Sequence, residues 1–133
     1  YNMSITIGTK GEARTKVTEQ NTAQAMGSGS LPVFATPAMA ALMEQAAYTS
    51  LLPYLDNGQG SVGISLTLSH SSASPLGMNI RAVSTVTEVD GKKITFSVSA
   101  YDDAGLIGEG VHQRFLINNE RFLAKAAKKA EVH

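Results

Sequence analysis

The sequence predicts an α+β fold in which an antiparallel β-sheet wraps around one long α-helix. The first observation behind this is the stretch Val33–Leu52, which is rich in Ala, Met and Leu and carries one charge, Glu44. A helix that is apolar nearly all round is typical of a protein interior. The second is that the chain from residue 61 to 118 alternates between apolar and polar residues, with turn signals between the alternating segments.

The pair Thr36-Pro37 predicts where the long helix begins. A threonine hydroxyl can accept from free amides of the first turn, and proline at the first helical position gives up no needed donor. Pro53 and the turn at 56–58 predict its end. Because a sheet can cover such a helix on one side only, we expect a second molecule to cover the rest.

The segments before the helix are shorter and more polar. Ile5–Ile7 and Gly11–Glu19 alternate weakly, which predicts outer or edge strands. Asn21–Met26 predicts a single helical turn capped by Asn21. Gly27–Ser30 has the sequence GSGS, which is typical of a plain loop or of a mobile rim beside a site.

Four strands are expected after the helix. In the first, His70 continues an apolar face, and Gly63 lies on the opposite, polar face. Asp90-Gly91 is a strong signal for a tight hairpin. The tail from 120 to 130 predicts a basic amphipathic helix whose apolar face holds Phe122. The expected strands are 61–69, 78–89, 93–101 and 106–118.

Length and composition limit the function classes. We expect one domain over residues 1–133, with a core at about 11–118 and the helical tail at 120–130. A net charge of zero gives no reason to expect nucleic acid or a membrane surface as a partner. The absence of cysteine excludes thiolate chemistry and fits a reducing compartment, so we expect a cytoplasmic protein. Three dispersed histidines argue against a metal site.

Glu44, His70 and Thr36 are the candidates for chemistry, and each has a structural alternative. Glu44 is either paired with a basic residue at the wet end of the helix or a general base or nucleophile tuned by burial. His70 is either a core residue with one hydrogen bond or a group that transfers a proton near neutral pH. Thr36 is either the helix cap or a hydroxyl among amides that favour negative charge.

Spacing restricts how these groups can cooperate. Thr36 and Glu44 are eight residues apart, about 12 Å along a helix that rises about 1.5 Å per residue. They cannot both touch one small reacting group within one chain unless the helix is irregular. The last strand places His112 and Arg114 on one face, and we expect Arg114 to form an ion pair with Glu44 or to contact an anionic substrate.

Four motifs resemble the hotdog-fold thioesterases related to fluoroacetyl-CoA thioesterase: VFATPAMAALMEQAA, VGISLTLSHSSASPLGM, VDGKKITFSVSAYD and GLIGEGVHQRF. The resemblance runs from about Gly11 to Ile117. It implies a hotdog fold, a homodimer with active sites at its interface, and hydrolysis of an acyl-CoA thioester without a cofactor. The implied catalytic residues are Thr36, Glu44 and His70. Gly63 and Arg114 correspond to substrate-contacting positions.

One segment departs from these relatives. They carry bulky apolar side chains over the acyl pocket, whereas this chain has Gly27–Ser30, with Leu31 and Phe34 nearby. We therefore expect Phe34 to contact substrate and do not expect selectivity for fluoroacetyl groups. Two other functions remain open: a hotdog hydratase or dehydratase, and a non-catalytic acyl-CoA-binding protein.

Overall fold

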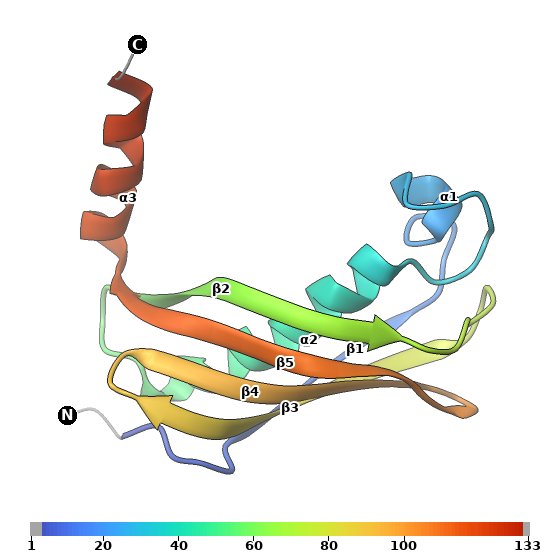
Figure 1. Ribbon diagram of the computed structural model, residues 1–133, viewed down its shortest axis with the longest axis horizontal. Helices are drawn as coiled ribbons and strands as arrows, with labels where there is room; N and C mark the ends of the chain where they lie inside the picture. The colour runs from blue at the N-terminus through green and yellow to red at the C-terminus, as the bar shows by residue number, and fades with distance from the viewer. Residues whose placement is uncertain (1–3, 132–133) are drawn as a thin grey trace.

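A computed structural model describes residues 4–131, and the ends of the expected domain lie outside them. Five strands form one antiparallel sheet, and a long helix lies across its concave face (Figure 1). The predicted α+β class is therefore confirmed. The elements are β1 (Lys10–Lys16), α1 (Ala23–Met26), α2 (Thr36–Leu51), η1 (Leu52–Tyr54), β2 (Gln59–His70), β3 (Asn79–Asp90), β4 (Lys93–Asp102), β5 (Gly105–Asn118), α3 (Asn119–Lys128) and η2 (Lys129–Glu131).

The strand order is β1-β3-β4-β5-β2, with every pair antiparallel, so β1 and β2 are the two edges. The hairpin predicted at Asp90-Gly91 joins β3 to β4. Gly91 has a φ of 60°, a left-handed conformation that glycine adopts without a steric penalty. All four strands predicted after the helix are present.

The core lies between α2 and the concave face of the sheet. One side of α2 is buried, and its opposite side exposes Ala41, Gln45 and Tyr48. Gly11 of β1 allows the closest approach, because a Cβ there would collide with the carbonyl oxygen of Ala46 on α2. The fully buried residues of α2 include Met39, Met43, Ala46, Ala47 and Leu51, which belong to one core cluster with strand residues such as Phe96 and Val98.

Two local predictions before the helix are wrong. Ile5–Ile7 does not form a strand, and pairing begins at Lys10 of β1. The cap of α1 is Thr22, whose hydroxyl accepts from the amide of Ala25 at 3.1 Å. Asn21 instead stabilises the preceding turn, because its side chain accepts from the Thr18 amide and donates to the Lys16 carbonyl.

The predicted faces of β2 also need correction. The register with β5 shifts between Gly63 and Ser65, so Ile64 is an extra residue in a β-bulge. Gly63 pairs with Arg114, and Leu66 pairs with His112. Because residues 112 and 114 share a face, the bulge turns Gly63 to the concave face beside α2 rather than to the polar side.

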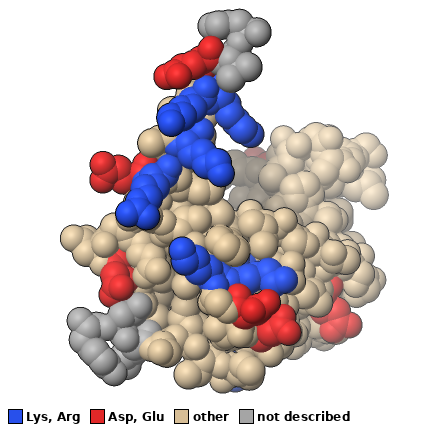
Figure 2. All heavy atoms as spheres, turned by 60° about the vertical axis from the view of Figure 1, so that its left-hand side comes forward, with Lys and Arg blue, Asp and Glu red and all other residues tan. Residues whose placement is uncertain are grey.

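The helix α3 follows β5 directly and projects from the end of the sheet opposite α1 (Figure 1). Its predicted apolar face is exposed, with Leu123 66% accessible. Positive side chains gather along it (Figure 2). Among residues 4–131, no helix has the length and apolar character needed to cross a membrane.

Candidate active site

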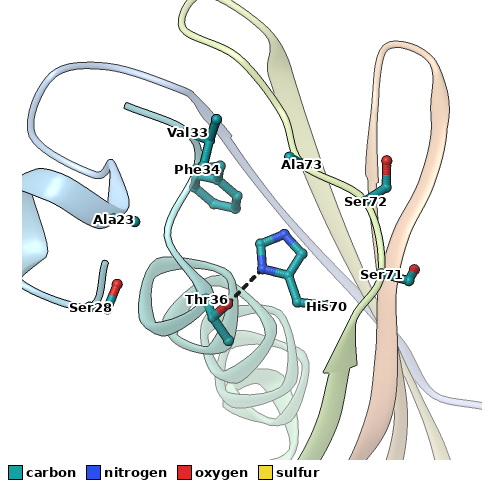
Figure 3. Close-up of a pocket in the computed structure, with 9 residues that line it drawn as sticks. All are labelled: Ala23, Ser28, Val33, Phe34, Thr36, His70, Ser71, Ser72 and Ala73. Atoms are coloured by element: carbon teal, nitrogen blue, oxygen red, sulfur yellow. Dashed lines mark hydrogen bonds between the residues drawn. The ribbon is translucent and has the colours of Figure 1, made fainter. Parts of the chain in front are cut away.

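Thr36 and His70 meet at the first turn of α2. The cap of this helix is Ala35, which has extended backbone angles and makes no side-chain hydrogen bond. The alternative of Thr36 as the helix cap is therefore wrong: Thr36 is the first helical residue. Its hydroxyl lies 2.8 Å from Nδ1 of His70 at the end of β2 (Figure 3).

The His70 ring has one partnered and one unpartnered nitrogen. Nε2 is buried without a hydrogen-bond partner in the described residues. Phe34 packs edge-on to the ring, with centroids 6.5 Å apart. Burial lowers the pKa of His70, and the nearby Ser72 backbone opposes that shift. The ring is therefore neutral near pH 7 and has one basic nitrogen.

A pocket of about 250 Å³ opens beside this pair. Phe34, Thr36 and His70 form one wall, and Ala23 and Ser28 lie opposite them (Figure 3). The strand break predicted after His70 supplies the remaining wall, residues 71–73. Leu31 is 63% exposed and does not line the pocket. Of Leu31 and Phe34, the two apolar residues predicted near the acyl pocket, only Phe34 lies beside the Thr36–His70 pair.

Glu44 belongs to a second group of residues, two helical turns further along α2. A Cβ placed on Gly63 would lie 3.2 Å from Oε2 of Glu44, 3.3 Å from Cε1 of His112 and 3.5 Å from an NH of Arg114. The bulge in β2 therefore lets a carboxylate, an imidazole and a guanidinium converge on a residue without a side chain.

Arg114 is held by the strand pair β2–β5. Its Nε donates to the hydroxyl of Ser61 at 2.9 Å and a terminal nitrogen donates to the Ser61 carbonyl at 3.0 Å. In the described residues it forms no ion pair with Glu44 within 4.0 Å, so the predicted salt bridge is absent. Burial lowers the pKa of Arg114, and the negative charge of Glu44 opposes this. The two groups interact electrostatically without direct contact.

His112 is the site residue that sequence reasoning did not single out. It is fully buried, beside Glu44 and Arg114. Its signal in the sequence was its alternation with Arg114 on the last strand. Gly108 lies on the same face of β5 and leaves no open space there, because a Cβ on it would lie 2.6 Å from the Met39 side chain.

Within one chain the predicted residues therefore form two groups. Thr36, His70 and Phe34 lie at the start of α2, and Glu44 lies with Gly63 and Arg114 further along it. No cluster of three or more His, Asp and Glu side chains suited to a metal ion occurs within residues 4–131.

Comparison with known proteins shows the family of the chain. The family described as fluoroacetyl-CoA-specific thioesterase (FlK) matches residues 17–120. The fluoroacetyl-CoA thioesterase of Streptantibioticus cattleyicolor is 38% identical over 97 residues, 73% of this chain and 70% of that protein.

Solved structures of this kind share the whole architecture. The structure of the fluoroacetyl-CoA thioesterase FlK is 31% identical and has a TM-score of 0.89, covering 96% of this chain and 98% of its own. A thioesterase superfamily member from Thermus thermophilus is 28% identical with a TM-score of 0.89, covering 96% and 95%.

The curled sheet around α2 thus defines a hotdog-fold thioesterase, as the sequence predicted. More narrowly, the chain belongs to the fluoroacetyl-CoA-specific thioesterase family, whose pattern covers most of its length. The prediction of a thioester hydrolase is confirmed at the level of this family.

Proposed function

We propose that this protein hydrolyses an acyl-CoA thioester to the free acid and CoA. The observation that carries the proposal is the hydrogen-bonded pair of Thr36 and His70 at the start of α2, facing a pocket in a chain of the thioesterase family. A neutral imidazole oriented by a hydroxyl is suited to proton transfer at a thioester carbonyl. The whole chain is proposed to act as one domain.

The proposed chemistry needs an oxyanion site and an activated nucleophile. The first amides of a helix have no intrahelical acceptor and carry partial positive charge, so the start of α2 favours the negative charge of a tetrahedral intermediate. Glu44 takes a proton from water as water attacks the carbonyl, or attacks directly to give an anhydride that water then hydrolyses. His70 relays the proton taken from water to the departing CoA thiolate and ends neutral again, and Thr36 orients the imidazole.

The separation of the two groups leads us to propose a homodimer with composite sites. In it, the Thr36–His70 pair acts with Glu44 of the partner subunit. Strand β2 supports this proposal: it is a twelve-residue edge without Lys, Arg, Asp or Glu, and its bulge residue Ile64 is 51% exposed. The other edge, β1, carries charges at alternate positions, which protect an edge from pairing.

The enzyme is proposed not to be selective for fluoroacetyl-CoA. The relatives are named for fluoroacetyl-CoA. In this chain the pocket wall facing Thr36 consists of Ala23 and Ser28, and Leu31 is exposed and does not line the pocket. A pocket without bulky cover gives little basis for selecting one two-carbon acid. We also propose a cytoplasmic enzyme, because acyl-CoA esters are intracellular metabolites.

Release of CoA thiol from a panel of acyl-CoA esters tests the function. We expect turnover by the wild-type protein and a loss of roughly 10²-fold or more in kcat for Glu44→Ala and His70→Ala. Glu109→Ala removes an exposed carboxylate from β5 and serves as the matched control. Near wild-type rates in both site variants would refute the mechanism. Consumption of enoyl-CoA without thiol release would instead indicate a hydratase, and tight acyl-CoA binding without turnover a binding protein.

A further inference from the structure

His112 is a buried polar residue to which the proposed mechanism gives no part. Its Nδ1 lies 2.8 Å from the carbonyl oxygen of Ser65, and its Nε2 lies 3.2 Å from a terminal nitrogen of Arg114. A carbonyl only accepts and a guanidinium only donates. His112 therefore carries its proton on Nδ1, and its Nε2 lone pair receives the hydrogen bond from Arg114.

The His112 ring is fixed from three directions. The ring of Phe96 on β4 stacks on it with centroids 6.0 Å apart, the Ser65 carbonyl on β2 accepts from Nδ1, and Arg114 on β5 donates to Nε2. Burial lowers the pKa of His112 and the Arg114 charge adds to this, against the Ser65 carbonyl and Glu44. The imidazole is thereby kept neutral, the form in which it can accept from Arg114.

Arg114 is consequently held on two sides. Ser61 accepts from Nε and from one terminal nitrogen, and His112 accepts from the other terminal nitrogen. A Cβ on Gly63 would lie 3.5 Å from the nitrogen that His112 binds. The hydrogen bond from Arg114 to His112 thus sets the position of the guanidinium edge that faces Gly63 and Glu44.

We propose that His112 is a positioning residue for thioester hydrolysis, fixing the Arg114 guanidinium beside Gly63 and Glu44 through its Nε2 acceptor. The inference rests on the proposed function and adds a residue that acts without touching the reacting group. Without His112 the guanidinium keeps its two bonds to Ser61 and its place 5.8 Å from the centroid of the Tyr48 ring, but its released terminal nitrogen can turn toward Glu44 and pair with it. The carboxylate would then be less available to water or to the thioester carbonyl.

Two amide substitutions separate the two nitrogens of the ring. The amide of His112→Gln reaches the position of Nε2 and can still accept from Arg114. His112→Asn can donate to the Ser65 carbonyl from the position of Nδ1 but offers Arg114 no acceptor. We expect kcat to fall about tenfold in His112→Asn, the size of one charge-assisted hydrogen bond, with KM changed less than kcat. His112→Gln should recover most of the rate.

A double-mutant cycle shows whether His112 acts through Arg114. The kcat loss from His112→Asn should largely vanish in an Arg114→Met background, since there is no guanidinium left to position. Multiplicative losses would overturn the proposal. So would a lower Tm in His112→Asn with unchanged kcat per folded molecule, because that result describes a purely structural residue.

A second readout does not depend on turnover. Exchange with solvent of the terminal Arg114 N–H that donates to His112, measured by NMR, should be slow in the wild type and in His112→Gln, and about tenfold faster in His112→Asn. Equal exchange in all three proteins would overturn the positioning role. If the wild type releases no thiol from any acyl-CoA, the proposed function fails on its own, and this exchange measurement still decides whether His112 orients Arg114.

Discussion

At the scale of single residues, Thr36 shows how backbone geometry separates two roles that the sequence leaves open. Threonine before proline is a common way to begin a helix, so the cap and the functional hydroxyl were equal alternatives. In the structure Ala35 takes the cap position, and Thr36 is an exposed residue bonded to His70. Its hydroxyl makes no capping bond to the helix and is available for the proposed chemistry.

Thr36→Val should therefore reduce activity without destabilising the helix. The substitution keeps the branched shape but removes the partner of His70 Nδ1. We expect kcat to fall roughly 10²-fold, which is the rate contribution lost when an acid–base group is misplaced. The Tm should stay nearly unchanged. Thr36→Ser keeps a hydroxyl and should recover much of the rate. Thiol release and thermal unfolding measure the two effects, and a clear drop in Tm would restore the capping role.

At the scale of elements, the contact between β1 and α2 sets how closely the helix lies on the sheet. Gly11 faces the backbone of α2 at Ala46 and the side chain of Ser50. In the sequence, Gly11 only begins a weak, mostly polar strand segment and has no predicted role. Its importance comes from a helix that is far away in the chain, so no local pattern could reveal it.

Gly11→Ala should destabilise the fold. The added methyl group would collide with the Ala46 carbonyl oxygen and lie 2.7 Å from Cβ of Ser50, so the helix or the strand must shift. We expect the free energy of unfolding to fall by roughly 1–3 kcal/mol. Gly29→Ala meets only the Ala23 side chain, at 3.3 Å, and is the control. Urea unfolding decides, and equal stability of the two variants would contradict the close contact.

At the scale of the whole molecule, the separation of the two groups of site residues leads to the proposed composite site. Thr36 of the first group and Glu44 of the second lie on the same helix, α2, but at different turns. An uncharged edge strand, β2, runs beside both groups, with His70 at its end and Gly63 at its bulge. Pairing of two such edges would bring residues of two chains together.

Mixed dimers test the composite site. A heterodimer of Glu44→Ala and His70→Ala chains, purified with two different tags, contains one site with all three groups and one with only Thr36. We expect about half of the wild-type rate per dimer, although each variant alone is nearly inactive. Sedimentation confirms the dimer. An inactive heterodimer would mean that each site lies within one chain, and a monomeric wild type would remove the composite site altogether.

Much of the fold follows from local sequence. The hairpin at Asp90-Gly91, the four later strands and the long helix were all predicted, because turn residues and apolar periodicity act over a few positions. The strand predicted at Ile5–Ile7 is absent, because alternation over three residues does not determine whether a neighbouring strand is there to pair with. The predicted cap of α1 was wrong because Asn21 and Thr22 are both good capping residues. The side chain of Asn21 bonds within the preceding turn, so Thr22 caps the helix.

The sequence by itself determined the hotdog thioesterase class, the helix at the centre of the sheet and the residue types proposed for the chemistry. Only the tertiary structure decided which groups meet. Thr36 forms a hydrogen bond with His70, 34 positions away in the sequence. The bulge at Ile64 turns Gly63 to the concave face, and His112 lies between Ser65 and Arg114. Such contacts depend on register and on packing between distant segments, whereas sequence patterns report only the preferences of neighbouring residues.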